Sequence, residues 1–209
     1  VDAGVLNVTA DNLLAVNAQI RKQQVADGNT DNLDSVADLQ AKVVSAEAAL
    51  AYLISDVAVE NGTDDAGTGT LTEQAQLDAY VDAGVLSVTP DNLLAVNAQL
   101  RKQQLADGNT DNLDTVADLQ AQVVAADNAL AYLVNDVQFE TFAQDDVTGT
   151  AAVLTTTEQL AAYAEAGVRA VTVDNLLAVN AQLRLETTAA DKDSVADIQT
   201  LVGLAESAL

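Results

Sequence analysis

The segment from Asp27 to Asp38 has the residue types and spacing of a calcium-binding loop. EF-hand loops place oxygen ligands at positions 1, 3, 5, 9 and 12 and use a backbone carbonyl at position 7. Here those positions carry Asp, Asn, Asp, Ser and Asp, with Leu33 at position 7. The same pattern recurs from Asp107 to Asp118. The side chains predicted to hold two calcium ions, the only cofactor that the sequence suggests, are Asp27, Asn29, Asp31 and Asp38, and Asp107, Asn109, Asp111 and Asp118.

Two features of these loops depart from the EF-hand pattern. Asn32 and Asn112 stand at position 6 in place of glycine, and position 12 is Asp, which is one methylene shorter than the usual bidentate Glu. The third repeat loses the pattern, because its loop at 186–194 is four residues shorter and contains Lys192. The alternative interpretation is a polar turn whose Asp and Asn side chains cap the next helix and contact solvent. The sequence leaves both interpretations open.

Composition argues against catalysis and against nucleic-acid binding. Cys, His, Met and Trp are absent, so no thiol nucleophile, imidazole base or disulfide can form. The carboxylates of Glu60, Asp64 and Asp65 lack a third catalytic group beside them, and we predict that the protein is not an enzyme. The 32 acidic residues exceed the 8 basic ones, which gives a net charge of -24 that repels nucleic acid and anionic membranes. No apolar run is long enough to predict membrane insertion.

The sequence repeats itself with a period of about 80 residues. Residues 1–50 and 81–130 align without a gap and are identical at 41 of 50 positions, and a shorter copy covers 164–209. Such a period predicts an array in which each repeat mainly contacts its neighbours. We predict three repeats, at 1–70, 71–150 and 151–209, in which the first helix of repeat 1 and the last helix of repeat 3 are truncated. The chain is therefore expected to be a segment of a longer array, or a protomer completed by its neighbours.

Each repeat is predicted to contain three helices, which makes the fold all-α. In repeat 2 they cover about 72–83, 90–106 and 115 onward. Thr70 with Glu73, and Thr155 with Glu158, have the spacing of a capping box, and Gly84 suits the end of the first helix. The units are expected to be small three-helix bundles or turns of a helical solenoid. Linkers rich in Gly, Asp and Thr lie at 61–70 and 145–150.

The third helix carries apolar residues at alternating steps of three and four. This spacing predicts one buried seam along the helix. Its members are Val116, Leu119, Val123, Ala126, Leu130, Leu133 and Val137, and in repeat 1 they are Val36, Leu39, Val43, Ala46, Leu50, Leu53 and Val57.

Asn17, Asn97 and Asn180 stand in the apolar face of the second helix of each repeat. A buried amide needs hydrogen-bond partners, so these residues are predicted to tie down a neighbouring loop or the backbone of the next repeat. A role in fixing the register between repeats or chains is the functional alternative. Tyr52, Tyr80, Tyr132 and Tyr163 are expected to be half-buried, with the hydroxyl in water.

The run from Ala83 to Gln99 (AGVLSVTPDNLLAVNAQ), followed by VADLQ at 116–120, resembles helical repeats of very large bacterial surface proteins. Those are the biofilm-associated and RTX-like adhesins. The resemblance implies secretion, extension from the cell surface and an adhesive or matrix function, with copies of the repeat as partners in a homo-polymer or a tethered array. The glycine-rich calcium nonapeptides of RTX segments are missing from this chain.

Overall fold

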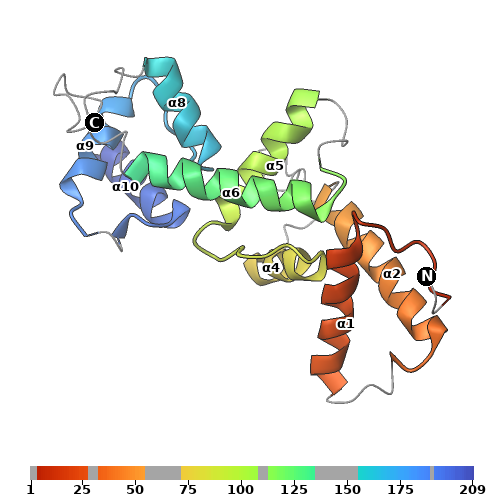
Figure 1. Ribbon diagram of the computed structural model, residues 1–209. Helices are drawn as coiled ribbons and strands as arrows, with labels where there is room; N and C mark the ends of the chain where they lie inside the picture. Colours follow the sequence, from red (N-terminus) through yellow and green to blue (C-terminus); the bar gives the residue numbers. More distant parts are fainter. Residues whose placement is uncertain (1–3, 28–32, 55–71, 108–112, 135–154, 189–190) are drawn as a thin grey trace, which may run out of the picture. The chain divides into compact units, whose positions relative to one another are not determined.

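The computed structural model describes residues 4–27, 33–54, 72–107, 113–134, 155–188 and 191–209, and over these ranges the chain is helical with no strand (Figure 1). The prediction of an all-α fold is therefore confirmed. None of the helices in the described part is long and apolar enough to cross a membrane. The predicted linkers at 61–70 and 145–150 lie outside these ranges.

The helices follow the predicted order within each repeat, which we call first, second and third helix. The first helices are α4 (Glu73–Asp82) and α8 (Thr156–Glu165). The second helices are α1 (Leu13–Asp27), α5 (Leu93–Asp107) and α9 (Leu176–Leu185). The third helices are α2 (Val36–Tyr52), α6 (Val116–Tyr132) and α10 (Val195–Ser207).

The chain forms two compact units whose composition differs from that of the sequence repeats. Unit 1 contains Val1–Val88 and Leu100–Gln122, and unit 2 contains Thr89–Gln99 and Val123–Leu209. Unit 1 therefore combines α1 and α2 of repeat 1 with α4, the end of α5 and the start of α6 of repeat 2. Unit 2 combines the start of α5 and the rest of α6 with all three helices of repeat 3. Each unit thus contains one place where consecutive repeats meet.

In unit 1, α4 packs against both α1 and α2, which also pack against each other (Figure 1). Val43, Ala46, Leu50 and Leu53 are buried along α2, and Tyr80 of α4 is completely buried. In unit 2, α9 packs on α10, where Ile198 and Val202 are buried. Burial of these apolar side chains is the main source of stability of each unit.

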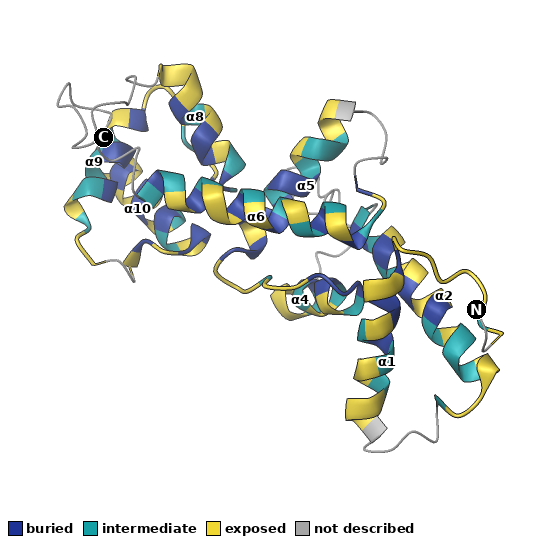
Figure 2. Ribbon diagram, viewed as in Figure 1, coloured by how far each residue is buried: buried dark blue, intermediate teal, exposed yellow. Residues whose placement is uncertain are grey.

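The predicted seam of the third helix is confirmed in repeat 2 and only in part in repeat 1. In α6, every seam residue from Val116 to Leu133 is buried, and the alternation of buried and exposed residues can be followed in Figure 2. In repeat 1 the seam is buried from Val43 to Leu53, whereas Leu39 is half-buried and Val36 is 47% exposed. Val57 and Val137 lie outside the described residues.

Helix starts are fixed by side-chain caps. Ser35 and Asp38 form a capping box at α2, and Thr155 and Glu158 form the predicted one at α8. The hydrogen bonds from Thr155 lower the pKa of the Glu158 carboxyl. At α4 the cap is Thr72, which accepts a hydrogen bond from the backbone N–H of Ala75, and not the predicted Thr70. The predicted helix start at about residue 72 is confirmed, whereas the predicted capping residue was two positions too early because both threonines have cap chemistry.

Candidate functional site at the junction between repeats

A glycine turn after the first helix brings two backbones into direct contact. Gly84 has a φ of +75°, and the N–H of Val85 donates to the carbonyl of Tyr80 at 2.9 Å, which closes the helix end. A Cβ on Gly84 would lie 2.7 Å from the backbone oxygen of Leu14 in α1. Gly167 has the same conformation, and its Cβ would lie 2.6 Å from the backbone oxygen of Leu94 in α5. Both turns therefore need glycine for conformation and for space.

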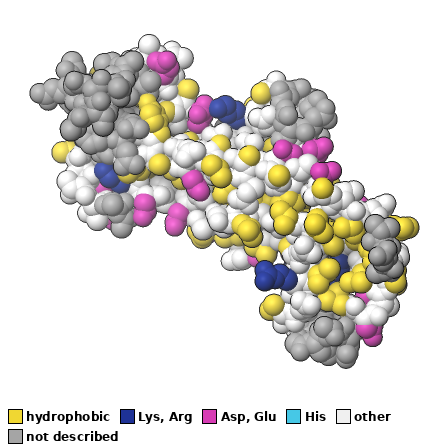
Figure 3. All heavy atoms as spheres, viewed as in Figure 1, with side chains coloured by type: hydrophobic (Ala, Val, Ile, Leu, Met, Phe, Trp, Pro, Cys, Tyr) yellow, Lys and Arg dark blue, Asp and Glu magenta, His cyan; other side chains and the backbone are white. Residues whose placement is uncertain are grey.

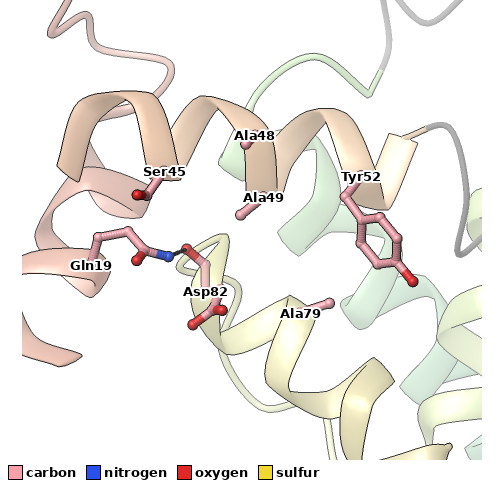
Figure 4. Close-up of a pocket in the computed structure, with 7 residues that line it drawn as sticks. All are labelled: Gln19, Ser45, Ala48, Ala49, Tyr52, Ala79 and Asp82. Carbon is pink, nitrogen blue, oxygen red and sulfur yellow. Dashed lines mark hydrogen bonds between the residues drawn. The ribbon is translucent and has the colours of Figure 1, made fainter. Parts of the chain in front are cut away.

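Side chains of the second helix hold the end of the next repeat's first helix. The Gln19 amide donates to the backbone carbonyl of Asp82 at 2.7 Å, as Figure 4 shows, and Gln99 donates to that of Glu165 at 2.6 Å. Lys22 adds an ion pair to the Asp82 carboxylate at 2.5 Å. The Lys22 side chain is 57% exposed, so this pair contributes little stability. The buried glutamine bonds are the more important contacts.

A second backbone contact joins the same repeats through the third helix. The N–H of Val116, at the start of α6, donates to the carbonyl of Asp11 at 3.4 Å. In the other unit, the N–H of Val195, at the start of α10, donates to the carbonyl of Asp91 at 3.2 Å. We call this combination the repeat junction: a glycine turn and a third-helix start, both packed on the second helix of the preceding repeat.

A glutamine of each third helix clamps the turn that carries the junction. The side-chain amide of Gln120 bonds both the N–H and the carbonyl of Leu86, at 2.9 and 3.0 Å. The residue after each clamped position has a positive φ, as Ser87 does with 65°. The equivalent pairs are Leu6 with Gln40 and Arg169 with Gln199. Sequence reasoning missed this clamp, because a glutamine on a helix surface gives no sign of a partner 30 to 34 residues away.

The Asn residues that begin each second helix have a related role. In unit 2, Asn175 accepts a hydrogen bond from the N–H of Thr172 at 2.7 Å and donates to the carbonyl of Ala170 at 2.8 Å. Asn12 bonds Thr9 and Asn7 in the same way. These buried amides fix the entry into the second helix.

The predicted burial of the central asparagine is confirmed for Asn97 and Asn180 and is wrong for Asn17. Asn180 accepts a hydrogen bond from the Tyr163 hydroxyl at 2.5 Å and donates to Gln159 at 2.9 Å, both on α8 of the same repeat. Asn17 is exposed, and within the described residues no first helix packs against it as α8 packs against Asn180. In unit 2 the asparagine therefore joins two helices within one repeat.

Tyr52 and Tyr132 are half-buried as expected, but the Tyr52 hydroxyl is buried and not in water. Tyr80 and Tyr163 are completely buried, which the prediction did not expect. Burial raises the pKa of both buried phenols well above the usual range. Folding thus favours the neutral phenol, and stability should be retained below the ordinary tyrosine pKa of about 10 and fall as the pH rises above it.

We therefore expect the Tyr163 phenol to stay protonated at pH values where tyrosine in the urea-unfolded chain is ionised. The measurement is an NMR titration of the Tyr163 ring carbon that bears the hydroxyl, with the unfolded chain as control. Titration of Tyr163 at the ordinary value in the folded chain would contradict its burial.

A hollow of about 430 Å³ lies beside the junction in unit 1 (Figure 4). Its lining consists mostly of small side chains, and the carboxylate of Asp82 already pairs with Lys22. The residues that line it are Gln19, Ser45, Ala48, Ala49, Tyr52, Ala79 and Asp82. This set has no nucleophile with an adjacent base, so the hollow does not indicate a reaction.

The predicted calcium ligands fall partly outside the described residues. Asn29, Asp31, Asn109 and Asp111 lie there, and Asp27 and Asp107 are the last residues of α1 and α5. Asp38 and Asp118 are described, and both act in helix capping: the Asp118 carboxylate accepts from the Thr115 hydroxyl at 2.6 Å. A calcium ion at position 12 would compete with this cap. No group of three or more acidic side chains suited to a metal is present within the described ranges.

Calcium binding at these loops stays a prediction, and calorimetry tests it. The loop hypothesis predicts two saturable sites, each lost on Asp27→Ala or Asp107→Ala, because position 1 supplies a carboxylate ligand. Absence of heat at millimolar calcium would favour the capping interpretation. The matched control is Asp174→Ala, which removes an exposed carboxylate outside both loops.

On the face drawn in Figure 3, the acidic side chains of the described residues are scattered and do not form one patch. Comparison with protein-family models, curated proteins and solved structures found no match.

Proposed function

We propose that this chain is a structural repeat segment of a bacterial extracellular adhesin, matrix fibre or surface filament, and that it acts through packing between consecutive repeats. The observation that carries the proposal is the repeat junction, which recurs with equivalent residues in both units. At both junctions a buried glutamine of one repeat bonds the backbone of the next repeat, so the recurring contacts favour a role in joining repeats.

The composition supports the same function. A net charge of -24 keeps a long, crowded polymer soluble and limits unspecific adhesion between its charged surfaces. The absence of cysteine suits a protein that does not depend on disulfides outside the cell. The partners under this proposal are neighbouring repeats and copies of the chain, and the location is the cell surface or the extracellular matrix.

Immunogold electron microscopy tests the location and the assembly together. Antibodies raised against the purified chain should label fibres or the outer surface of the bacteria that produce it. Bacteria from which the coding sequence has been deleted are the control. Label confined to the cell interior would contradict the proposal.

A further inference from the structure

The surface on which the next repeat packs has the same residues in repeats 1 and 2. We call it the receiving surface. It lies at the start of the second helix, where both junctions place their backbone contacts and the buried glutamine bond. Its members are Asp11, Leu14, Ala15 and Gln19 in repeat 1, and Asp91, Leu94, Ala95 and Gln99 in repeat 2. The two receiving surfaces are therefore chemically identical.

The contacts on the two receiving surfaces also have nearly the same geometry. A Cβ on Gly84 or Gly167 would lie 2.7 or 2.6 Å from the oxygen of the leucine that the turn approaches. Gln19 and Gln99 donate to the end of the first helix at 2.7 and 2.6 Å. The third-helix starts donate to the aspartate carbonyls at 3.4 and 3.2 Å. Each distance thus differs by 0.2 Å or less between the junctions.

The first helices that pack on these surfaces, α4 and α8, differ in sequence only where they are exposed or half-buried. Six of the twelve residues at 72–83 differ from their equivalents at 155–166, and none of the six is buried in either helix. The residues buried in α4 are unchanged: Gln76, Tyr80 and Ala83 correspond to Gln159, Tyr163 and Ala166, which are also buried. Variation between repeats therefore leaves the buried contacts of the first helix intact.

One of the six substitutions lies beside the receiving surface, where Asp82 of α4 corresponds to Glu165 of α8. Both residues carry a carboxylate, so Lys22 keeps an acidic partner with either helix. The hollow of about 430 Å³ beside Asp82 is lined mostly by small side chains and has room for the additional methylene group of glutamate. This difference does not prevent an exchange of the two helices.

We propose that the repeat junctions are interchangeable, so that the receiving surface of repeat 1 binds the glycine turn of repeat 3 as well as that of repeat 2. The partner of a receiving surface is then any repeat of this kind, and an array can lose or gain a whole repeat without losing a junction. This inference rests on the proposed function, because it describes how repeats that act by packing select their neighbours.

Removal of residues 84–166 tests this inference most sharply. It deletes 83 residues, which is one period, and joins Ala83 directly to Gly167. The helix end of repeat 2 is then followed by the turn of repeat 3. This turn should pack on the backbone of Leu14, because Leu14 occupies the place of the leucine that Gly167 approaches in the full chain.

The shortened chain offers an equivalent partner for each contact of repeat 3 that loses its own. The N–H of Val195 should donate to the carbonyl of Asp11, which is equivalent to its present acceptor. The side chain of Asn180 should bond Tyr80 and Gln76, which have the residue types of its present partners on α8. A complete junction is therefore expected in the shortened chain.

Urea unfolding and amide hydrogen exchange of the shortened chain provide the measurement. It should unfold cooperatively, and protection of the α1 amides should stay within about tenfold of that in the full chain. Gly167→Ala in the shortened chain should lower this protection about a hundredfold, because the methyl group would overlap the Leu14 backbone. The same substitution in the full chain is the control. It should leave α1 unchanged, because Gly167 there approaches Leu94 of α5.

A second variant keeps the full length and exchanges only the first helix. It carries the sequence of residues 155–166 at positions 72–83, and protection of α1 should again stay within about tenfold of the parent value. A shortened chain that does not fold would overturn the proposal. So would a shortened chain in which Gly167→Ala leaves α1 unchanged, or a loss of protection beyond tenfold in the exchanged variant.

The outcomes for the junction and for the proposed function can be separated. An unfolded shortened chain, together with antibody label on the bacterial surface, would refute interchangeable junctions alone. A shortened chain that behaves as expected, together with label confined to the cell interior, would refute the proposed function alone.

Discussion

Replacing Gly84 by alanine should destabilise unit 1 by about 3 kcal/mol or more, the largest effect that we expect from any single methyl group. Two costs combine. A left-handed backbone conformation costs an alanine about 1 kcal/mol. The new Cβ would also lie 2.7 Å from the Leu14 oxygen and 2.9 Å from the Ala15 nitrogen, so one backbone segment must move away from the other.

Gly4→Ala separates these two costs, because Gly4 has a similar positive φ but open space where the Cβ would lie. Only the conformational cost should remain at this position. It should destabilise the monomeric chain by only about 1 kcal/mol. Urea unfolding followed by circular dichroism measures the free energy of unfolding of both variants, and amide hydrogen exchange in α1 and α4 measures their local stability. Equal losses for Gly4→Ala and Gly84→Ala would mean that the close approach to Leu14 does not exist in solution.

Replacing Asn180 by leucine should destabilise unit 2 by about 2–3 kcal/mol. The substitution preserves the approximate size of the side chain but removes the acceptor of the Tyr163 hydroxyl and the donor to Gln159. Asn180 and Tyr163 are 0% and 1% exposed, so water cannot replace the lost bonds without opening the packing between α8 and α9.

The same substitution at the equivalent position of repeat 1 is the control. Asn17 is exposed, so Asn17→Leu should change stability by about 0.5 kcal/mol or less. Amide hydrogen exchange in α8 and α9 measures the loss of stability caused by Asn180→Leu. Exchange in α1 measures the loss caused by Asn17→Leu. A similar effect at both positions would show that the asparagine acts through helix propensity and not through the Tyr163 network.

The sequence alone predicted the helices and the buried seam, because periodic apolar residues and cap residues are local signals. The seam residues from Val116 to Leu133 are buried as their spacing requires, and α8 is capped by the predicted Thr155. Asn17 shows the limit of this reasoning. Three identical segments in the sequence have different burial, because burial depends on which neighbouring helices are present.

The junction itself was only partly predictable. Gly84 was identified as a helix terminator, but its contact with Leu14 joins residues 70 positions apart, and no local pattern contains that information. Gln19 and Gln120 look like solvated helix residues in the sequence, yet both bond distant backbone. In retrospect, the recurrence of Gln at 19, 99 and 182 and at 40, 120 and 199 was the available signal.

The central claim is that consecutive repeats are joined through the glycine turn, and a double-mutant cycle between Gln19→Ala and Gly84→Ala tests it most directly. Gln19→Ala alone should cost about 1 kcal/mol, through loss of the bond to the Asp82 carbonyl. In the Gly84→Ala variant the turn has moved away from α1, so Gln19→Ala should change the free energy of unfolding by almost nothing. The difference between the two backgrounds gives a coupling energy of about 1 kcal/mol. Additivity within about 0.3 kcal/mol would show that the two residues do not share a junction and would contradict the account.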